Sequence, residues 1–200
     1  RASLFIQGYP ISVDASHFLE EINGSVVRGP RQVLVREQGL LQVLMSLINQ
    51  MIPISARAEE IVQAQAVAKG AKRAKIKDPE YITEGKAILE KCFILLYHCI
   101  KGSAENQMYV ADFMPVLLAH LGGGGQAYAG KCVNEMLSTN MELQEEKIGS
   151  REIAIFISKL RASRMNPTYL GLLKSCCSCQ GKGVDGNQCK VAEMLFENMN

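Results

Sequence analysis

The chain has 200 residues, 48% of them hydrophobic, which is enough apolar material for one substantial core. Its 22 basic and 20 acidic residues leave a formal net charge of +2. This balance argues against a chain-wide basic surface of the kind that binds nucleic acid or anionic membranes, so an electrostatic partner must bind locally.

Seven cysteines are spread through apolar, helix-like sequence and not along a loop-rich framework. An odd number in this pattern is typical of a reduced, cytosolic protein. The longest stretches without a charged side chain, residues 38–56 and 113–130, contain polar residues, prolines or a run of glycines, so neither is expected to span a membrane. The chain begins at Arg1 without a methionine or a leader, which favours an internal excerpt of a longer protein.

The N-terminal residues 1–13 read either as an extended lead-in or as the first turn of a helix. Asp14 is a suitable N-cap for a short helix that ends near Ile22, where apolar residues recur at helical spacing. Residues 1–28 are therefore predicted to form a lead-in and a short helix before the main domain, residues 29–200.

Pro30 stands where a helix would begin, and apolar residues then recur every three or four positions as far as Pro53, which predicts a core helix. The next stretch is rich in alanine and ends in a segment near 66–78 that we expect to be flexible. Its basic residues, without an acidic one between them, are Lys69, Lys72, Arg73, Lys75 and Lys77. They form either a solvated helix end or a patch for an anionic partner, and the lack of interleaved aromatic residues argues against nucleic acid.

Asp78-Pro79 is predicted to start a helix whose apolar residues cover more than half its circumference, so it should be buried on nearly every side. Gly102-Ser103 breaks this helix, and a second apolar helix continues to Leu121. Pro115 should kink that helix or shift its start, because proline lacks a backbone donor and clashes with the preceding turn. The four glycines at 122–125 read as a hinge or a slack loop.

Five further helical patterns complete the chain, and strand-like alternation is nearly absent, so no sheet is expected beyond residues 1–13. The pattern predicts an all-α fold of about seven to nine helices, stacked as an armadillo-like superhelix, although no fixed repeat period is visible. The five patterns lie at residues 132–137, 141–147, 150–164, 168–179 and 188–199, and Asn166-Pro167 supplies a cap followed by proline at the start of the fourth.

Cys176, Cys177 and Cys179, with Cys189, invite a zinc-site interpretation. A helix would point adjacent cysteines about 100° apart, however, so we expect core cysteines and no metal. The histidines are dispersed, and His98 within an apolar helix is expected to be a core or interface residue. Since no nucleophile, acid–base pair or phosphate loop stands out, neither an enzyme nor a cofactor is predicted.

Three segments resemble the RIH domain, the helical module of ryanodine receptors and inositol trisphosphate receptors, over roughly residues 30–198. Arg31–Leu41 is similar to a family helix that reads Arg-Glu-Gln before an aliphatic run. Ile100–Gln107 resembles the break between the two central helices of the family, and Tyr169–Gln188 resembles its Cys-rich helix, glycine loop and Asn-Gln. The resemblance also implies the armadillo-like superhelix.

The resemblance places the inositol trisphosphate contacts of the family on Val33, Arg36, Ser103, Ala104 and Glu105. Arg36 alone keeps a basic side chain, so it is the one ligand-binding candidate. A triphosphorylated ligand needs several charge-assisted hydrogen bonds. Binding of inositol trisphosphate by this chain alone is therefore not expected.

The resemblance implies a non-catalytic, cytosolic scaffold or regulatory domain of a tetrameric intracellular calcium-release channel. It would relay conformational change to the pore from the cytoplasmic face of the endoplasmic or sarcoplasmic reticulum. Its partners would be neighbouring domains of the same channel within a homotetramer, with no nucleic acid and no direct membrane insertion. A ryanodine-receptor-type domain, a second inositol trisphosphate receptor copy and a divergent receptor all stay open. The alternative is a free-standing armadillo-like adaptor that binds peptides or acidic partners through residues 69–77.

Overall fold

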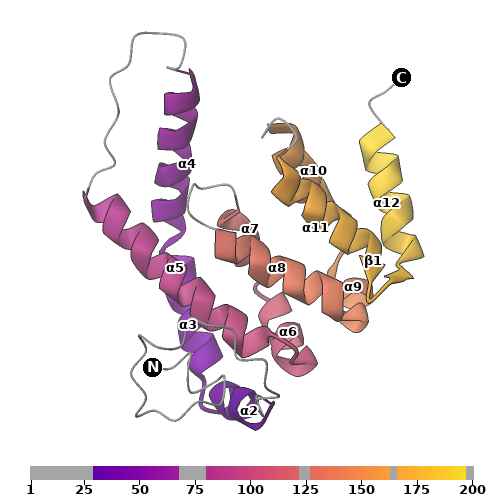
Figure 1. The fold of residues 1–200 in the computed structure, drawn as a ribbon, viewed down its shortest axis with the longest axis horizontal. Helices are drawn as coiled ribbons and strands as arrows, with labels where there is room; N and C mark the ends of the chain where they lie inside the picture. The colour runs from indigo at the N-terminus through magenta and orange to yellow at the C-terminus, as the bar shows by residue number, and fades with distance from the viewer. Residues whose placement is uncertain (1–28, 68–79, 122–126, 163–165, 197–200) are drawn as a thin grey trace, which may run out of the picture.

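The computed structural model describes residues 29–67, 80–121, 127–162 and 166–196 (Figure 1). Four predicted features lie outside these residues. They are the lead-in and short helix of residues 1–28, the basic residues from Lys69 to Lys77, the helix start at Asp78-Pro79, and the glycine tract at 122–125. No helix in the described ranges is long and apolar enough to cross a membrane.

Helices make up nearly all of the described part of the chain, which confirms the all-α prediction. The expected count of seven to nine helices is too low, because eleven occur there and two expected helices are each divided. The helices are α2 (Gly29–Glu37), α3 (Leu40–Gln50), α4 (Ile52–Val67), α5 (Glu80–Ile100), α6 (Ala104–Ala111), α7 (Met114–Ala119), α8 (Ala127–Thr139), α9 (Met141–Lys147), α10 (Ser150–Ala162), α11 (Pro167–Cys177) and α12 (Asp185–Phe196).

The first division falls at Gly39, inside the core helix expected between Pro30 and Pro53. Gly39 has φ +71°, a left-handed conformation that glycine adopts without a steric penalty. Its N–H bonds to the carbonyl of Arg36, which closes the end of α2. Pro53 does not end the helical run as expected but lies in the first turn of α4, where a missing N–H costs nothing.

Prolines start two other helices in the way that the sequence indicates. Pro115 lies in the first turn of α7, so the apolar segment after Gly102-Ser103 is divided into α6 and α7, which confirms a shifted start. At α11, Asn166 caps the helix by accepting a hydrogen bond of 2.9 Å from the N–H of Thr168. Pro167 is the first residue of that helix.

A short hairpin interrupts the C-terminal helices and corrects the expectation that no strand occurs after residue 13. Ser178–Cys179 (β1) pairs antiparallel with Lys182–Gly183 (β2). Gln180 and Gly181 both have positive φ, +50° and +78°, as a tight two-residue hairpin turn requires. The preceding helix, α11, therefore ends two residues earlier than the predicted Cys179, and α12 begins three residues earlier than Gln188.

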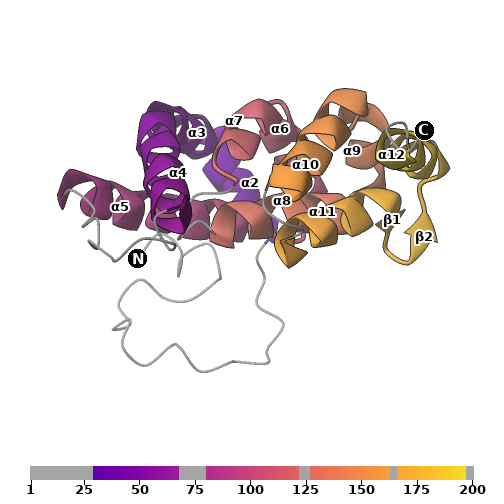
Figure 2. The ribbon, with the colours of Figure 1, turned by 90° about the horizontal axis from the view of Figure 1, so that it is seen from above.

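The helices lie in two layers. α5, α8 and α11 run side by side in the same direction (Figure 1), and α8 packs against both of the others. Figure 2 shows α4, α7, α6, α10 and α9 in the layer above them. These five helices therefore cover one face of the row formed by α5, α8 and α11.

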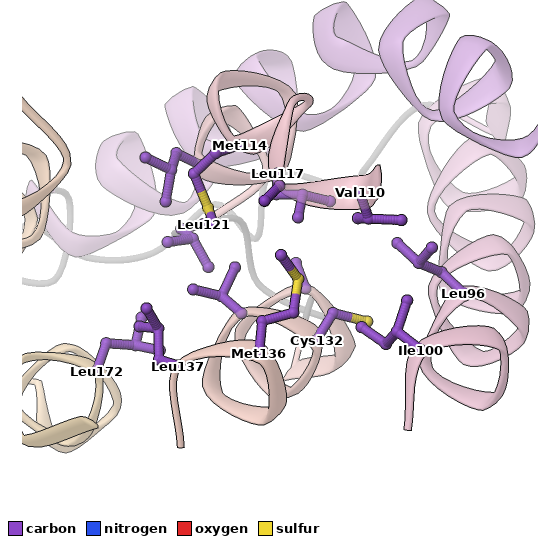
Figure 3. Close-up of a cluster of buried hydrophobic side chains, with 14 of the residues drawn as sticks. Leu96, Ile100, Val110, Met114, Leu117, Leu121, Cys132, Met136, Leu137 and Leu172 are labelled. Carbon is purple, nitrogen blue, oxygen red and sulfur yellow. The ribbon is translucent and has the colours of Figure 1, made fainter. Parts of the chain in front are cut away.

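The core fills the space between the two layers. Figure 3 shows side chains of α5, α6, α7, α8 and α11 meeting around Cys132 and Met136, both fully buried. The prediction of core cysteines is confirmed for five thiols, whereas Cys177 is half-buried. It is wrong for Cys189, which is exposed on α12. The five buried cysteines are Cys92, Cys99, Cys132, Cys176 and Cys179.

Candidate functional site

The predicted ligand residue, Arg36, lies in the last turn of α2 and reaches the start of α6. Its Nη1 atom is 2.6 Å from Oε2 of Glu105 and 3.5 Å from Oδ1 of Asn106. The side chains of Arg36 and Glu105 are 26% and 70% exposed, so the ion pair stabilises the fold by about 1 kcal/mol or less. The structure thus brings together two of the positions that the resemblance singles out.

The other three positions that the resemblance singles out carry no positive charge that could bind an anion. Val33 is an aliphatic, half-buried residue of α2, and Ala104 is exposed at the first position of α6. Ser103 is the N-cap residue of α6, but its side chain makes no capping hydrogen bond. An anion that approaches Arg36 would have to displace the carboxylate of Glu105 and would gain no second cation from these positions.

Buried amides organise the framework behind this ion pair. The last carbonyls of α5, which ends at Ile100, have no partner within the helix. Gln32 of α2 is 2% exposed, and its Nε2 atom donates to the carbonyls of His98 and Lys101, each at 2.9 Å. A single side chain therefore holds α2 against the end of α5.

Asn106 and Gln107 of α6 complete the same helix end. Nδ2 of Asn106 donates to the carbonyl of Cys99 at 2.8 Å and to that of Gln32 at 3.1 Å. Nε2 of Gln107 donates to the carbonyl of Ile100 at 3.1 Å. Because buried polar groups are costly when unsatisfied, these bonds fix how α2, α5 and α6 meet.

A second amide cluster joins α8, α9, α11 and α12. Gln144 of α9 is fully buried, and its Nε2 atom donates to the carbonyl of Leu137 and, at 2.8 Å, to that of Ser175. Nδ2 of Asn187 lies 3.3 Å from both Oε1 of Gln144 and the carbonyl of Cys176. The ends of α8 and α11 are thereby tied to the helices that follow them.

The same arrangement occurs at α6 and at α12. Asn106 and Gln107 are the third and fourth residues of α6, and Asn187 and Gln188 are the third and fourth residues of α12. Both pairs donate to the last carbonyls of the helix before them, since Gln188 bonds to the carbonyl of Cys177 at 2.9 Å. An Asn-Gln pair soon after a helix break thus marks a side-chain cap for the preceding helix.

His120, immediately after α7, is a fully buried histidine that joins three helices. Its Nε2 atom lies 2.9 Å from the carbonyl of Ile48, which can only accept, so Nε2 carries the proton. Nδ1 then accepts from the Ser55 hydroxyl at 2.6 Å, and the ring packs edge-on against Phe93. Burial lowers the pKa of His120, which favours this neutral form.

The buried cysteines are in surroundings that disfavour thiolates. Burial raises the pKa of Cys99 to about 12 and that of Cys176 to about 12, so both stay protonated at neutral pH. A metal requires deprotonated thiols. Within the described ranges, no group of three or more His, Cys, Asp or Glu residues is placed to hold a metal ion.

Part of this site could be read from the sequence and part could not. Arg36 was singled out, but its contacts with Glu105 and Asn106 were not predicted. The capping roles of Gln32 and Gln144 were missed. Two features of the sequence could have indicated these roles. One is a polar residue at a helix position that apolar periodicity assigns to the buried face, and the other is the Asn-Gln pair that follows each of two helix breaks.

Comparison with protein families gives one finding. The family model of the RIH domain matches residues 12–200, which is nearly the whole chain. No match was found among curated proteins.

Proposed function

This chain belongs to the RIH domain family of ryanodine and inositol trisphosphate receptors, and we propose that it serves as a non-catalytic regulatory scaffold of such a channel. In this role it lies on the cytoplasmic face of the endoplasmic or sarcoplasmic reticulum and contacts neighbouring domains within a homotetramer. The match over residues 12–200 is the observation that carries the proposal. Relay of conformational change to the pore is the part that needs a direct test.

A relay requires an element that moves as a unit. The amide caps support such behaviour, because Gln32 and Asn106 hold α2 and α6 to the end of α5 through buried hydrogen bonds. A displacement of α2 would therefore be passed to α5, and from there to α8, which packs along it. The exposed ion pair between Arg36 and Glu105 is the weaker, adjustable link in this junction.

The helices are proposed to stack as an armadillo-like superhelix. Three units support this arrangement: α5 with α6, α8 with α9, and α11 with α12. In each, the first helix is capped at its end by an amide side chain of the helix that follows it. Such stacked pairs contact mainly their neighbours, as in helical repeat proteins.

We further propose that this chain alone does not bind inositol trisphosphate, because Glu105 already engages Arg36 and Val33 replaces a cation. Isothermal titration calorimetry near physiological salt should give no saturable signal at micromolar concentration. Glu105→Gln frees Arg36 but adds no cation, and it should also fail to bind. Saturable binding that Arg36→Ala abolishes would contradict the proposal.

The relay is tested in the full-length channel by single-channel recording in lipid bilayers. Glu105→Ala removes the α2–α6 ion pair and should change open probability or agonist sensitivity. The matched control is Arg57→Ala, which removes the exposed pair between Arg57 and Glu60 within α4 and should leave gating unchanged. Unaltered gating in an assembled Glu105→Ala channel would count against this junction as the coupling route.

A further inference from the structure

An open apolar groove is lined by residues of α10, α11 and α12. Figure 1 shows these three helices at the C-terminal end of the molecule. The volume of the groove is about 450 Å³. Leu170, Gly171 and Lys174 of α11 line it along one face of that helix, because residues three and four apart lie on the same side. Leu160 of α10 and Val191 of α12 contribute to its walls.

The groove follows α11 along the whole length of that helix. Its α11 lining extends from Pro167 to Cys177, three turns or about 15 Å at 1.5 Å per residue. Leu170, a large apolar residue in the lining of this groove, is 53% exposed. An apolar groove between helices can accept the apolar side of a partner helix.

Gly171 supplies an independent indication. It lies inside α11, where glycine is less favourable than alanine, and no atom of the residues that the structure describes lies within 4 Å of the position where its Cβ would be. Neither the backbone conformation nor packing against these residues therefore requires glycine. A missing side chain in the lining of a groove allows the close approach of another backbone.

Lys174 indicates the chemistry of the occupant. Among the described residues that line the groove it is the one charged residue, and no carboxylate of the described ranges forms an ion pair with it. A partner that places a carboxylate beside its apolar stripe would complement this charge. A second copy that docked by two-fold symmetry would instead place one Lys174 near another.

We propose that this groove binds an amphipathic α-helix of a partner polypeptide, with an apolar stripe at three- and four-residue spacing and a carboxylate beside it. The mode is that of a helix in a hydrophobic groove, in which the apolar stripe supplies affinity and Lys174 selects an acidic partner. The contact extends the proposed scaffold function by giving the chemistry of one neighbour. Binding by the isolated chain is measured without a channel, so either proposal can fail without the other.

The test uses the complete 200-residue chain and two fluorescein-labelled synthetic helices. Each has about 15 residues, the length at which an isolated helix becomes marginally stable. Leucines follow three- and four-residue spacing, and one flanking position is glutamate in the first peptide and lysine in the second. Fluorescence anisotropy should show saturable binding of the glutamate peptide and weaker binding of the lysine peptide.

Variants of exposed and half-buried residues separate binding from folding. Leu170→Ser should weaken binding about tenfold, the effect of losing one large apolar contact. Lys174→Glu should reverse the preference between the two peptides. Gly171→Leu should abolish binding by filling the groove. Val43→Ser changes another exposed apolar residue, 65% exposed on α3, and should leave the affinity unchanged.

The proposal is overturned by any of three results. The first is the absence of saturable binding of either peptide to the wild-type chain. The second is equal affinity of the glutamate peptide for the wild type, Leu170→Ser and Gly171→Leu. The third is a dimer in sedimentation velocity that Leu170→Ser dissociates, because a second copy would then occupy the groove.

Discussion

At the scale of single residues, His120 shows how a titratable group can be held neutral inside this core. The ring receives a hydrogen bond from Ser55 and donates one to the carbonyl of Ile48. Protonation would place a charge beside Phe93 in a region closed to solvent. The lowered pKa of His120 follows from this burial, and the bond to Ile48 opposes it only in part.

We predict that acidification destabilises the fold through His120. Since its folded pKa lies below the unfolded value of 6.5, the unfolded state takes up the proton first. The stability is therefore fully present above pH 6.5 and is lost as the pH falls below it, by at most about 1.4 kcal/mol per pH unit. Urea unfolding at several pH values between about pH 7.5 and about pH 5 measures this slope.

The control for this prediction is His120→Gln, which has no titratable side chain. It should be less stable than the wild type near neutral pH, but the difference should shrink as the pH falls. Parallel loss of stability in both proteins would assign the acid sensitivity to other groups.

At the scale of the helices, each buried amide cap should contribute more to the free energy of unfolding than an exposed hydrogen bond does. Asn106→Ala leaves the carbonyls of Cys99 and Gln32 without their donor in a buried place, at about 1–3 kcal/mol for each unsatisfied group. Urea unfolding should show a midpoint well below that of the wild type. Gln188→Ala removes one comparable bond from an exposed amide and should cost about 1 kcal/mol or less, because water replaces the donor. Equal losses in the two variants would contradict a special role for the buried cap.

Alanine should destabilise the fold at Gly39, between α2 and α3, and stabilise it at Gly171 in α11. Gly39→Ala forces a left-handed φ of +71° on a residue with a Cβ and should cost about 1–2 kcal/mol. Gly171→Ala lies in a helix interior with open space around it and should raise the melting temperature by about 2–4 °C. Thermal unfolding compares both with the wild type. Stabilisation by Gly39→Ala would mean that α2 and α3 can join into one helix.

Helix starts could be predicted from the sequence where one residue type dictates the backbone. Pro115 and the Asn166-Pro167 pair are such cases, because their effects are local. The hairpin could not be predicted, since Gln180 adopts φ +50° without being glycine and the paired strands have only two residues each. The helix break at Gly39 could not be predicted, because apolar periodicity continues across it.

Only the part of the site that matches a family motif could be predicted from the sequence. Arg36 was identified, but its partner Glu105 lies on a helix distant in sequence, and such a contact depends on the tertiary fold. The roles of Gln32 and Gln144 likewise depend on which helix ends come to lie beside them. Sequence periodicity shows which face of a helix is buried but not which carbonyls meet it there.

At the scale of the whole molecule, the row of α5, α8 and α11 determines how far a local change can spread. α8 packs against both outer helices, whereas each outer helix has its own cap cluster. Stability in stacked helical units is approximately a sum of unit and neighbour contributions. A substitution that removes one cap should therefore increase local unfolding of the helix pair that contains it more than of the pair at the other end of the row.

Hydrogen–deuterium exchange can test this expectation, which follows from the proposed superhelix. Asn187→Ala should speed exchange in α11 and α12 and leave α5 protected, because it removes the bond to the carbonyl of Cys176. Asn106→Ala should speed exchange in α5 and α6 and leave α12 protected. α8 should lose some protection in both variants, since it contacts both ends of the row. A uniform rise in exchange across all helices in both variants would instead show that the chain opens as one cooperative unit, and the stacked-unit description would then be wrong.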